Sequence, residues 1–450
     1  MRKVVIISYY FPPLGWSGVQ RTLKFVKYLR IFGWEPVVVT VGETKFSILD
    51  KSLEKEIPKD IKIIRVDDIV LKNVTDIMTN KLKEYVQLSI NLISDKQLKQ
   101  LYEEEIEKKF TELRNLLLLP DGNVIWANNV VKKIENEINF DEIDLIYTTS
   151  SPYSAHIIGD YIKKKYSIPW VSDFRDQWIN NPYVNYDKKS LRFKLESNLE
   201  ENIVKSCDKL VTTTSISKIN YINRYNLDRE KVTVITNGYD EEDFHNINID
   251  LKQNKFKIIY NGSFYLNITP YTFGIALQEL FIEKLVDYSN VEVILNGKSE
   301  AAIIDKFKDI LGIYRNVINV NGYLSHKKAL EIAANASILL LVCGKGEATK
   351  EVYTGKVFEY LRLRRPIISL SPKGSLVEEL LKETESGINI EYDDLEGIKK
   401  VILDSYNNWL VNNESRVNGT NIKKYERKEL TKKLVDLFNQ VILLDNTVKL

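Results

Sequence analysis

The chain has 450 residues, more than one ordinary hydrophobic core accommodates, so two domains are expected. Its hydrophobic fraction of 44% and charged fraction of 28% are those of a globular protein, and its net charge of +2 argues against bulk binding to nucleic acid. Two cysteines and three histidines offer neither a disulfide framework nor an obvious metal site, and no apolar run approaches the roughly 18 residues that span a membrane.

The chain opens with a β-rich apolar run at 3–10, and similar runs recur through its first half. These further predicted strands lie at 35–41, 61–66, 144–150, 168–173, 209–214 and 231–236. Helical patterns such as 18–32 and 153–165 separate several of them, and this alternation is typical of a parallel, doubly wound sheet. Residues 70–135 interrupt the pattern and predict an inserted, charged helical segment.

The strand pattern restarts after the polar stretch 239–255, which is the best candidate for a linker. The predicted strands of the second half lie at 256–262, 291–297, 317–323, 336–344 and 365–370. We therefore expect two Rossmann-like halves that face each other across a cleft at the carboxyl ends of their strands. Residues 424–445 predict an amphipathic helix. Its apolar stripe consists of Leu430, Leu434, Leu437, Phe438, Val441 and Leu444.

Six motifs follow one another nearly from end to end of the chain. They are "SYYFPPLGWSGVQRTLKFVKYL", "SSPYSAHIIG", "PWVSDFRDQW", "TTTS…VITNGYDEEDF", "NGYLSHKKALEIAANASILLLV" and "EVYTGKVFEYLRLRRPII". Each is weak alone, but in this order they resemble the retaining, nucleotide-sugar-dependent glycosyltransferases of the GT-B fold, family 4 type. The resemblance implies an α/β fold with an acceptor domain over 1–248 and a donor domain over 254–405. Terminal helices at 406–450 are then expected to return to the first domain.

The stretch "EVYTGKVFE" resembles the E-x7-E motif of these enzymes, with Glu351 and Glu359 at its ends. The resemblance implies that Glu351 faces the donor sugar and that Glu359 accepts the ribose hydroxyls. Backbone N–H groups at a helix N-terminus bind phosphate well. The residues assigned to the donor at this turn are Thr354, Gly355, Lys356 and Val357. The alternative is an ordinary acidic helix start followed by a solvated glutamate.

The loop "FPPLGWSGVQRTL" places Gly15 and Gly18 between the first strand and the first helix. In the family such a loop approaches the donor phosphates, where a Cβ would hold the ligand off. The loop is not G-x-G-x-x-G, so a dinucleotide cofactor is not expected. An ordinary strand-to-helix turn is the alternative, and Arg21 faces either phosphate or solvent.

The stretch "PWVSDFRDQW" places Asp173, Arg175 and Asp176 at the end of a predicted strand. Related enzymes have a histidine or an acidic residue near here, so the three are candidate catalytic residues that orient the acceptor or stabilise an oxocarbenium-like transition state. The alternative is a structural Asp–Arg pair that caps the following turn. His156 reads equally as a packed helix residue or a ligand contact.

The stretch "NGYLSHKKAL" resembles the family's loop around the nucleotide base, so Tyr323 and Leu324 are expected to contact the donor. A strand-end aromatic residue is the alternative for Tyr323. His245 and His326 read as surface residues.

The loop after the first strand of the second half also resembles the family, with Gly262 and Ser263 at the donor. Relatives follow this loop with an arginine and a lysine that grip the pyrophosphate, but no cation follows here through Thr272. The candidates to replace them are Lys298, Lys345, Lys350 and Lys356.

Together these features predict a retaining transfer of sugar from a nucleoside-diphosphate donor to a saccharide or lipid-linked acceptor. The resemblance implies front-face substitution without a metal ion, a role in bacterial surface polysaccharide or glycolipid assembly, and a cytoplasmic location with peripheral membrane contact left open. Neither the base nor the oligomeric state follows from the sequence. Two alternatives remain, a sugar-nucleotide epimerase of the same fold and a non-catalytic protein that binds sugar nucleotides.

Overall fold

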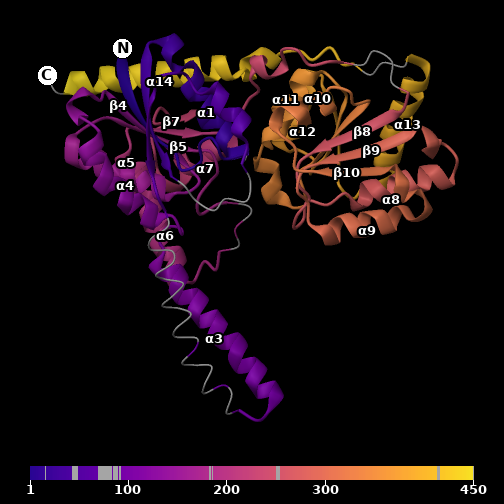
Figure 1. Cartoon of the computed structure of the whole chain (residues 1–450), viewed down its shortest axis with the longest axis horizontal. Coiled ribbons are helices and arrows are strands. Elements are labelled where there is room, and N and C mark those ends of the chain that lie inside the picture. The colour runs from indigo at the N-terminus through magenta and orange to yellow at the C-terminus, as the bar shows by residue number, and fades with distance from the viewer. Residues whose placement is uncertain are drawn as a thin grey trace. The chain divides into compact units, whose positions relative to one another are not determined.

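The computed structural model describes residues 1–15, 17–42, 49–68, 84, 90, 93–181, 184, 186–249, 254–412 and 416–448. The chain forms two compact units, Met1–Ile235 with Thr431–Leu450 and Thr236–Leu430. Each unit is a parallel sheet flanked by helices (Figure 1). The predicted α/β class with two Rossmann-like halves is therefore confirmed.

The first unit is built on a seven-stranded sheet. In spatial order its strands are β3 (Lys62–Val66), β2 (Trp34–Val41), β1 (Arg2–Ile7), β4 (Leu145–Ser150), β5 (Trp170–Phe174), β6 (Lys209–Thr212) and β7 (Val232–Val234). Its helices are α1 (Ser17–Leu29), α3 (Lys96–Leu117), α4 (Val124–Glu137), α5 (Ser154–Tyr166), α6 (Leu191–Ser206) and α7 (Ser215–Tyr225). The strand order reverses between β1 and β4, and ligands bind open sheets of this kind beyond the carboxyl ends at such a reversal.

The predicted insertion at 70–135 differs from the structure at its C-terminal end. Most of 69–92 lies outside the described residues, and α3 projects from the unit (Figure 1). In contrast, α4 packs against β3 and α5, with Trp126, Val130 and Ile134 fully buried. Because this stripe faces the core, α4 is the crossover helix between β3 and β4 rather than part of an insertion.

The second unit has a six-stranded parallel sheet. Its order is β10 (Ile318–Gly322), β9 (Val291–Asn296), β8 (Phe256–Asn261), β11 (Ile338–Val342), β12 (Ile367–Leu370) and β13 (Gly387–Ile390). Its helices are α8 (Tyr271–Ile282), α9 (Ala301–Leu311), α10 (His326–Ala333), α11 (Gly355–Leu363), α12 (Leu376–Thr384) and α13 (Leu395–Asn412). Apolar clusters fill both faces of the sheet. The sequence analysis missed β13, and the switch point lies between β8 and β11.

The second unit begins at Thr236, inside the stretch that the sequence analysis assigned to domain 1–248. The backbone of Tyr239 accounts for this difference. Its N–H donates to the Tyr425 carbonyl at 3.0 Å, and its own carbonyl accepts from the Arg427 N–H at 2.7 Å. The Tyr239 ring also lies in an apolar cluster of the second unit.

The terminal helix α14 (Arg427–Val448) contributes most of its length to the first unit. Phe438 is fully buried there, with its ring centroid 5.2 Å from that of Trp34 and 5.8 Å from that of Tyr147. Leu444 is 56% exposed, so the buried face ends before the last residue of the predicted stripe.

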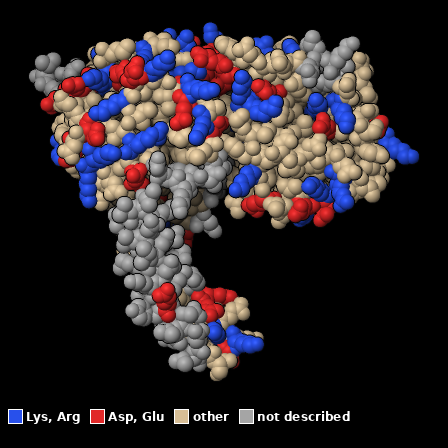
Figure 2. All heavy atoms as spheres, in the orientation of Figure 1, with Lys and Arg blue, Asp and Glu red and all other residues tan. Residues whose placement is uncertain are grey.

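Charged side chains are mixed in sign on the face of the molecule shown in Figure 2. Figure 2 shows lysine and arginine interspersed with aspartate and glutamate on both units, in keeping with the small net charge. Among the described residues, no helix is both long and apolar enough to cross a membrane.

We expect Phe438→Ala to destabilise the protein by about 3–5 kcal/mol, since it removes a fully buried ring from the first unit. Leu443→Ala, on the same helix but 61% exposed, is the matched control and should change the free energy of unfolding by at most about 0.5 kcal/mol. Chemical denaturation followed by fluorescence measures both. Equal effects of the two substitutions would contradict the packing described for α14.

Candidate active site

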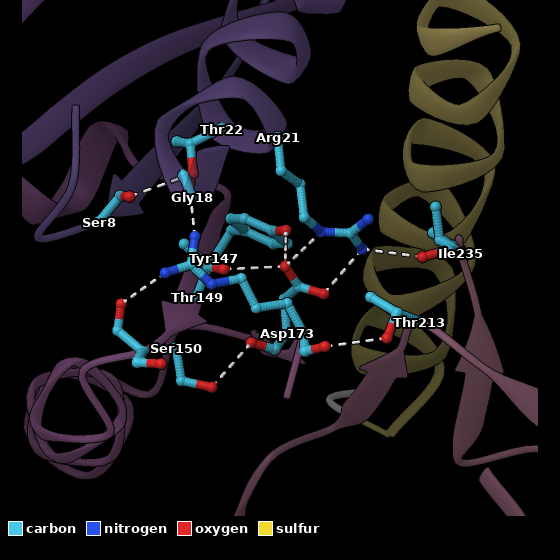
Figure 3. A network of polar contacts seen from close by, with 12 residues as sticks. Ser8, Gly18, Arg21, Thr22, Tyr147, Thr149, Ser150, Asp173, Thr213 and Ile235 are labelled. Carbon is cyan, nitrogen blue, oxygen red and sulfur yellow. Dashed lines mark hydrogen bonds and ion pairs between the residues drawn. The ribbon is translucent and has the colours of Figure 1, made fainter. Parts of the chain in front are cut away.

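A buried ion pair joins α1 to the carboxyl end of β5 in the first unit (Figure 3). Arg21 donates from Nε to Asp173 Oδ2 at 2.8 Å, and one terminal nitrogen donates to Asp173 Oδ1 at 2.8 Å. The same nitrogen donates to the Ile235 carbonyl at 3.0 Å. From β4, the hydroxyls of Tyr147 and Thr149 donate to Asp173 Oδ2 at 2.7 and 2.8 Å. Both carboxylate oxygens are therefore occupied.

The pair compensates for the burial of its own charges. Burial raises the pKa of Asp173, but the charge of Arg21 and the hydrogen bonds more than offset this and leave the pKa below its ordinary value. Burial lowers the pKa of Arg21, and Asp173 more than restores it. Asp173 thus offers no open oxygen to an acceptor, which favours its structural alternative. The expected positions of Arg21, facing phosphate or solvent, were both wrong.

Arg175 braces the loop between β1 and α1. One terminal nitrogen donates to the Gly18 carbonyl at 2.5 Å and the other to the Ser151 carbonyl at 3.0 Å, while its guanidinium lies 5.7 Å from the Tyr10 ring centroid. A Cβ at Gly18 would lie 2.7 Å from the guanidinium. A larger residue at this position would therefore require the Arg175 side chain to move. Gly15 lies half-buried earlier in the same loop.

Asp176 differs from its neighbour Asp173. It is half-buried, and its burial raises its pKa, which the charge of Arg175 only partly offsets. Among the described residues no hydrogen bond to its carboxylate is found. A carboxyl group with a raised pKa and open lone pairs is the candidate of this cluster for contact with a substrate hydroxyl.

His156 is a packed residue. Trp170 Nε1 donates to Thr148 Oγ1 at 2.8 Å, and the same hydroxyl shares a hydrogen bond with His156 Nδ1 at 2.7 Å. The ring is fully buried and stacks on Phe174. Burial lowers the pKa of His156 to about 3, so the imidazole stays neutral at ordinary pH.

In the second unit, Lys356 lies at the switch point between β8 and β11. Its Nζ donates to the Tyr260 hydroxyl at 2.9 Å, and this hydroxyl donates to the Ser263 carbonyl at 3.1 Å. A Cβ at Gly262 would overlap the Lys356 ammonium. The absence of that Cβ lets a cation from α11 reach the end of β8, where the sequence has no arginine or lysine of its own.

Lys356 has no carboxylate partner among the described residues. Burial lowers its pKa to about 8, an effect that Cys343 and Glu359 only partly offset. The other candidates differ: Lys345 pairs with Asp393 at 2.6 Å, Lys350 pairs with Glu347 at 2.8 Å, and Lys298 is exposed. A half-buried ammonium without a counterion is a site where an anion gains affinity.

The first turn of α11 adds further groups beside this ammonium. Thr354 is the N-cap residue, and its Oγ1 is buried without a hydrogen-bond partner. A Cβ at Gly355 would meet no atom within 4 Å, so the backbone there is open to approach. Val357 is different from what the sequence predicted: its side chain is fully buried and its N–H donates to the Thr354 carbonyl at 3.1 Å, so it offers no contact to a donor.

The remaining predicted donor residues lie around the same edge of the second sheet. Glu359 occupies the second turn of α11, and its Oε1 lies 2.8 Å from His326 Nε2. His326, expected to be a surface residue, is therefore engaged, with its side chain 19% exposed. Tyr323 is 42% exposed and Leu324 is half-buried just after β10. Glu351 is half-buried at the end of the 3-10 turn before α11.

A chain of asparagine side chains at this edge was missed. Asn321 donates to Asn296, Asn296 to Asn261, and Asn261 to the Ala329 carbonyl, at 2.8, 2.8 and 3.1 Å. Because a carbonyl can only accept, the last bond fixes the orientation of all three amides. The signal was visible in the sequence as an Asn-Gly pair at the end of each of the three strands.

Residues 90–243 match the family model described as Glycosyltransferase Family 4. None of the curated proteins matches the sequence. Solved structures match over nearly the whole chain. Sucrose-phosphate synthase from Thermosynechococcus elongatus has a TM-score of 0.64 at 12% identity and covers 99% of this chain and 100% of its own.

Two further structures share the fold. Anabaena HepE in complex with UDP-glucose has a TM-score of 0.59 at 13% identity, covering 98% of this chain and 100% of its own. WaaG, a glycosyltransferase involved in lipopolysaccharide biosynthesis, has a TM-score of 0.57 at 12% identity, covering 97% and 99%. At such identities the likeness concerns the arrangement of the chain, not the details of a site.

The ion pair yields a prediction about coupling. We expect Arg21→Met and Asp173→Asn each to destabilise the protein by about 3–5 kcal/mol, because each leaves a buried charge without its partner. The double variant should cost clearly less than the sum, as measured by chemical denaturation of all four proteins. Strictly additive losses would show that the two side chains do not stabilise each other.

Proposed function

We propose that this chain is a glycosyltransferase of the GT-B fold and of family 4 type that moves a sugar from a nucleoside-diphosphate donor to an acceptor hydroxyl with retention of configuration. The observation that carries the proposal is the Lys356 ammonium. It is half-buried, lacks a carboxylate partner among the described residues, and adjoins the N-terminus of α11. A diphosphate supplies the negative charge that this arrangement lacks.

The proposed donor site assigns one role to each group. Lys356, Thr354 Oγ1 and the backbone N–H groups of Gly355 and Lys356 take the phosphates, and Gly262 and Ser263 border them. Glu359 accepts the ribose hydroxyls. The base lies by Tyr323 and Leu324, and Glu351 faces the sugar. HepE, which shares the fold, was solved with UDP-glucose, and this supports the donor class.

In the proposed reaction the bond between the anomeric carbon and the phosphate oxygen breaks as the acceptor oxygen bonds to the same face of that carbon. The acceptor proton passes to the leaving phosphate. We assign the orientation of the acceptor hydroxyl to Asp176, whose carboxylate is open, rather than to the fully engaged Asp173. The positive charge from Lys356 and α11 stabilises the leaving diphosphate in place of a metal ion. Assembly of surface polysaccharide or glycolipid is the proposed setting.

The test is a thermal-shift panel of UDP, GDP, ADP, CDP and dTDP, followed by NMR of the matching sugar nucleotide with and without oligosaccharide acceptors. We expect one diphosphate to raise the melting temperature through binding to the native state. With a suitable acceptor, sugar should transfer with its anomeric configuration retained, and EDTA should not reduce turnover. Isomerisation of the donor without acceptor would establish an epimerase instead, and binding without turnover of either kind a non-catalytic protein.

The pKa of Lys356 predicts how donor affinity depends on pH. The charged ammonium binds phosphate, and it predominates below pH about 8 in the free protein. Bound phosphate raises the pKa of Lys356, so affinity for the diphosphate should fall and proton uptake on binding should appear as pH rises from 7 to about 9.5. Isothermal titration in two buffers of different ionisation enthalpy measures both.

Lys356→Met should weaken binding at pH 7 by about 1.5–3 kcal/mol, the range for hydrogen bonds to charged groups, and should flatten the pH dependence. Lys298→Met, which removes an exposed lysine, is the matched control. A Lys356→Met protein that binds diphosphate as tightly as wild type would contradict the assignment.

A further inference from the structure

The structure joins α10 and α11 through a histidine that the predicted donor site did not include. His326, the first residue of α10, places Nε2 2.8 Å from Glu359 Oε1. A carboxylate oxygen only accepts, so Nε2 carries the hydrogen. On the other side of the ring, Nδ1 lies 4.0 Å from Asp243 Oδ2. The side chains of His326, Glu359 and Asp243 are 19%, 22% and 13% exposed, so the cluster is packed yet reachable by a ligand.

We propose that His326 is a positioning residue that holds the Glu359 carboxylate in the orientation needed to accept the two ribose hydroxyls of the donor. This deepens the proposed function and rests on it. An ionised carboxylate has about four lone-pair sites. One hydrogen bond to His326 leaves the other lone-pair sites of Glu359 for the ribose. The same bond restricts rotation of the Glu359 carboxylate before the donor binds, so less conformational entropy is lost on binding.

Two other links make the pair of helices a rigid frame for this bond. The backbone N–H of Asn261, at the end of β8, donates to the Tyr360 hydroxyl on α11 at 2.8 Å. Its side chain donates to the Ala329 carbonyl on α10 at 3.1 Å. Both helices are therefore tied to one residue of the sheet, and the bond from His326 to Glu359 spans them at their ligand-facing ends. Tyr360, the residue after Glu359, is fully buried, so α11 is anchored in the core at this point.

An ion pair between Arg362 and Glu241 holds the turn that carries Asp243, the carboxylate on the other side of the imidazole ring. Arg362 on α11 donates from Nε to Glu241 at 2.6 Å. Glu241 opens the 3-10 turn Glu241–Phe244, which carries Asp243. The turn is thereby held to the same helix as Glu359, so that His326 has a fixed carboxylate on each side. Nε2 lies within hydrogen-bond distance of Glu359, whereas Nδ1 lies 4.0 Å from Asp243, too far for a hydrogen bond, so the bond to Glu359 sets the orientation of the ring.

The test compares a ribonucleoside diphosphate with its 2′-deoxy analogue and with pyrophosphate by isothermal titration. UDP and dUDP are used first, then the corresponding pairs of the other bases. The wild type should prefer the ribonucleotide by about tenfold, the worth of one hydrogen bond to a charged group. In His326→Leu that preference should fall below about threefold while pyrophosphate affinity stays unchanged. His326→Gln, which retains a donor, should keep most of the preference, and His245→Leu, at an exposed histidine, should match wild type.

Each other outcome overturns the idea in a recognisable way. If the wild type binds no nucleoside diphosphate, the proposed function and the role of His326 fail together. If it binds but His326→Leu keeps the ribose preference, His326 alone is misassigned. If His326→Leu weakens pyrophosphate binding as much as ribonucleotide binding, the residue is only part of the scaffold. The same conclusion follows if circular dichroism shows an equal loss of structure in His326→Leu and His326→Gln.

Discussion

The first unit depends on one buried ion pair, Arg21 with Asp173, which crosses from α1 to β5. Burying either charge without its partner would destabilise the fold, so each side chain requires the other together with the hydroxyls of β4 that donate to Asp173. The pair also reaches the carbonyl of Ile235, the last residue before the chain enters the second unit. The Arg21 guanidinium thereby links α1 to β5 and to Ile235, and the Asp173 carboxylate extends the link to two hydroxyls of β4.

The second unit treats its buried charge in the opposite way. Lys356 meets a phenol rather than a carboxylate, and its lowered pKa records an incomplete compensation. An incompletely compensated charge of this kind is characteristic of functional sites, where a bound ligand supplies the missing partner. The contrast separates the two charged centres: the Arg21–Asp173 pair satisfies both of its charges, whereas the Lys356 ammonium has only a phenol as its partner among the described residues, and the proposed function supplies an anion there.

The sequence was sufficient for most of the fold, because buried parallel strands are continuous apolar runs that need no partner to be visible. It failed at β13, whose four residues include the exposed Ile388 at a sheet edge, and at α4, where residues 70–135 read as one charged helical block. The partners of site residues were harder still. Arg21 and Asp173 are 152 positions apart, and His326 and Glu359 are 33, so only the folded chain brings them together. Lys356 could be named as a candidate, but its position against Gly262 could not be singled out.

The chain of asparagines at the ends of β8, β9 and β10 has a consequence for the lifetime of the protein. Each asparagine precedes a glycine, the pairing in which the next backbone nitrogen most easily attacks the side-chain amide and converts it to a carboxylate. Asn261 and Asn296 are buried, but Asn321 is exposed, so this chemical ageing is expected there first. The conversion would replace the donating nitrogen of Asn321 by an oxygen and set it against the Asn296 oxygen that it now serves. Old molecules would then lose the outermost link of the edge that borders the proposed base site, while the sheet beneath remained intact.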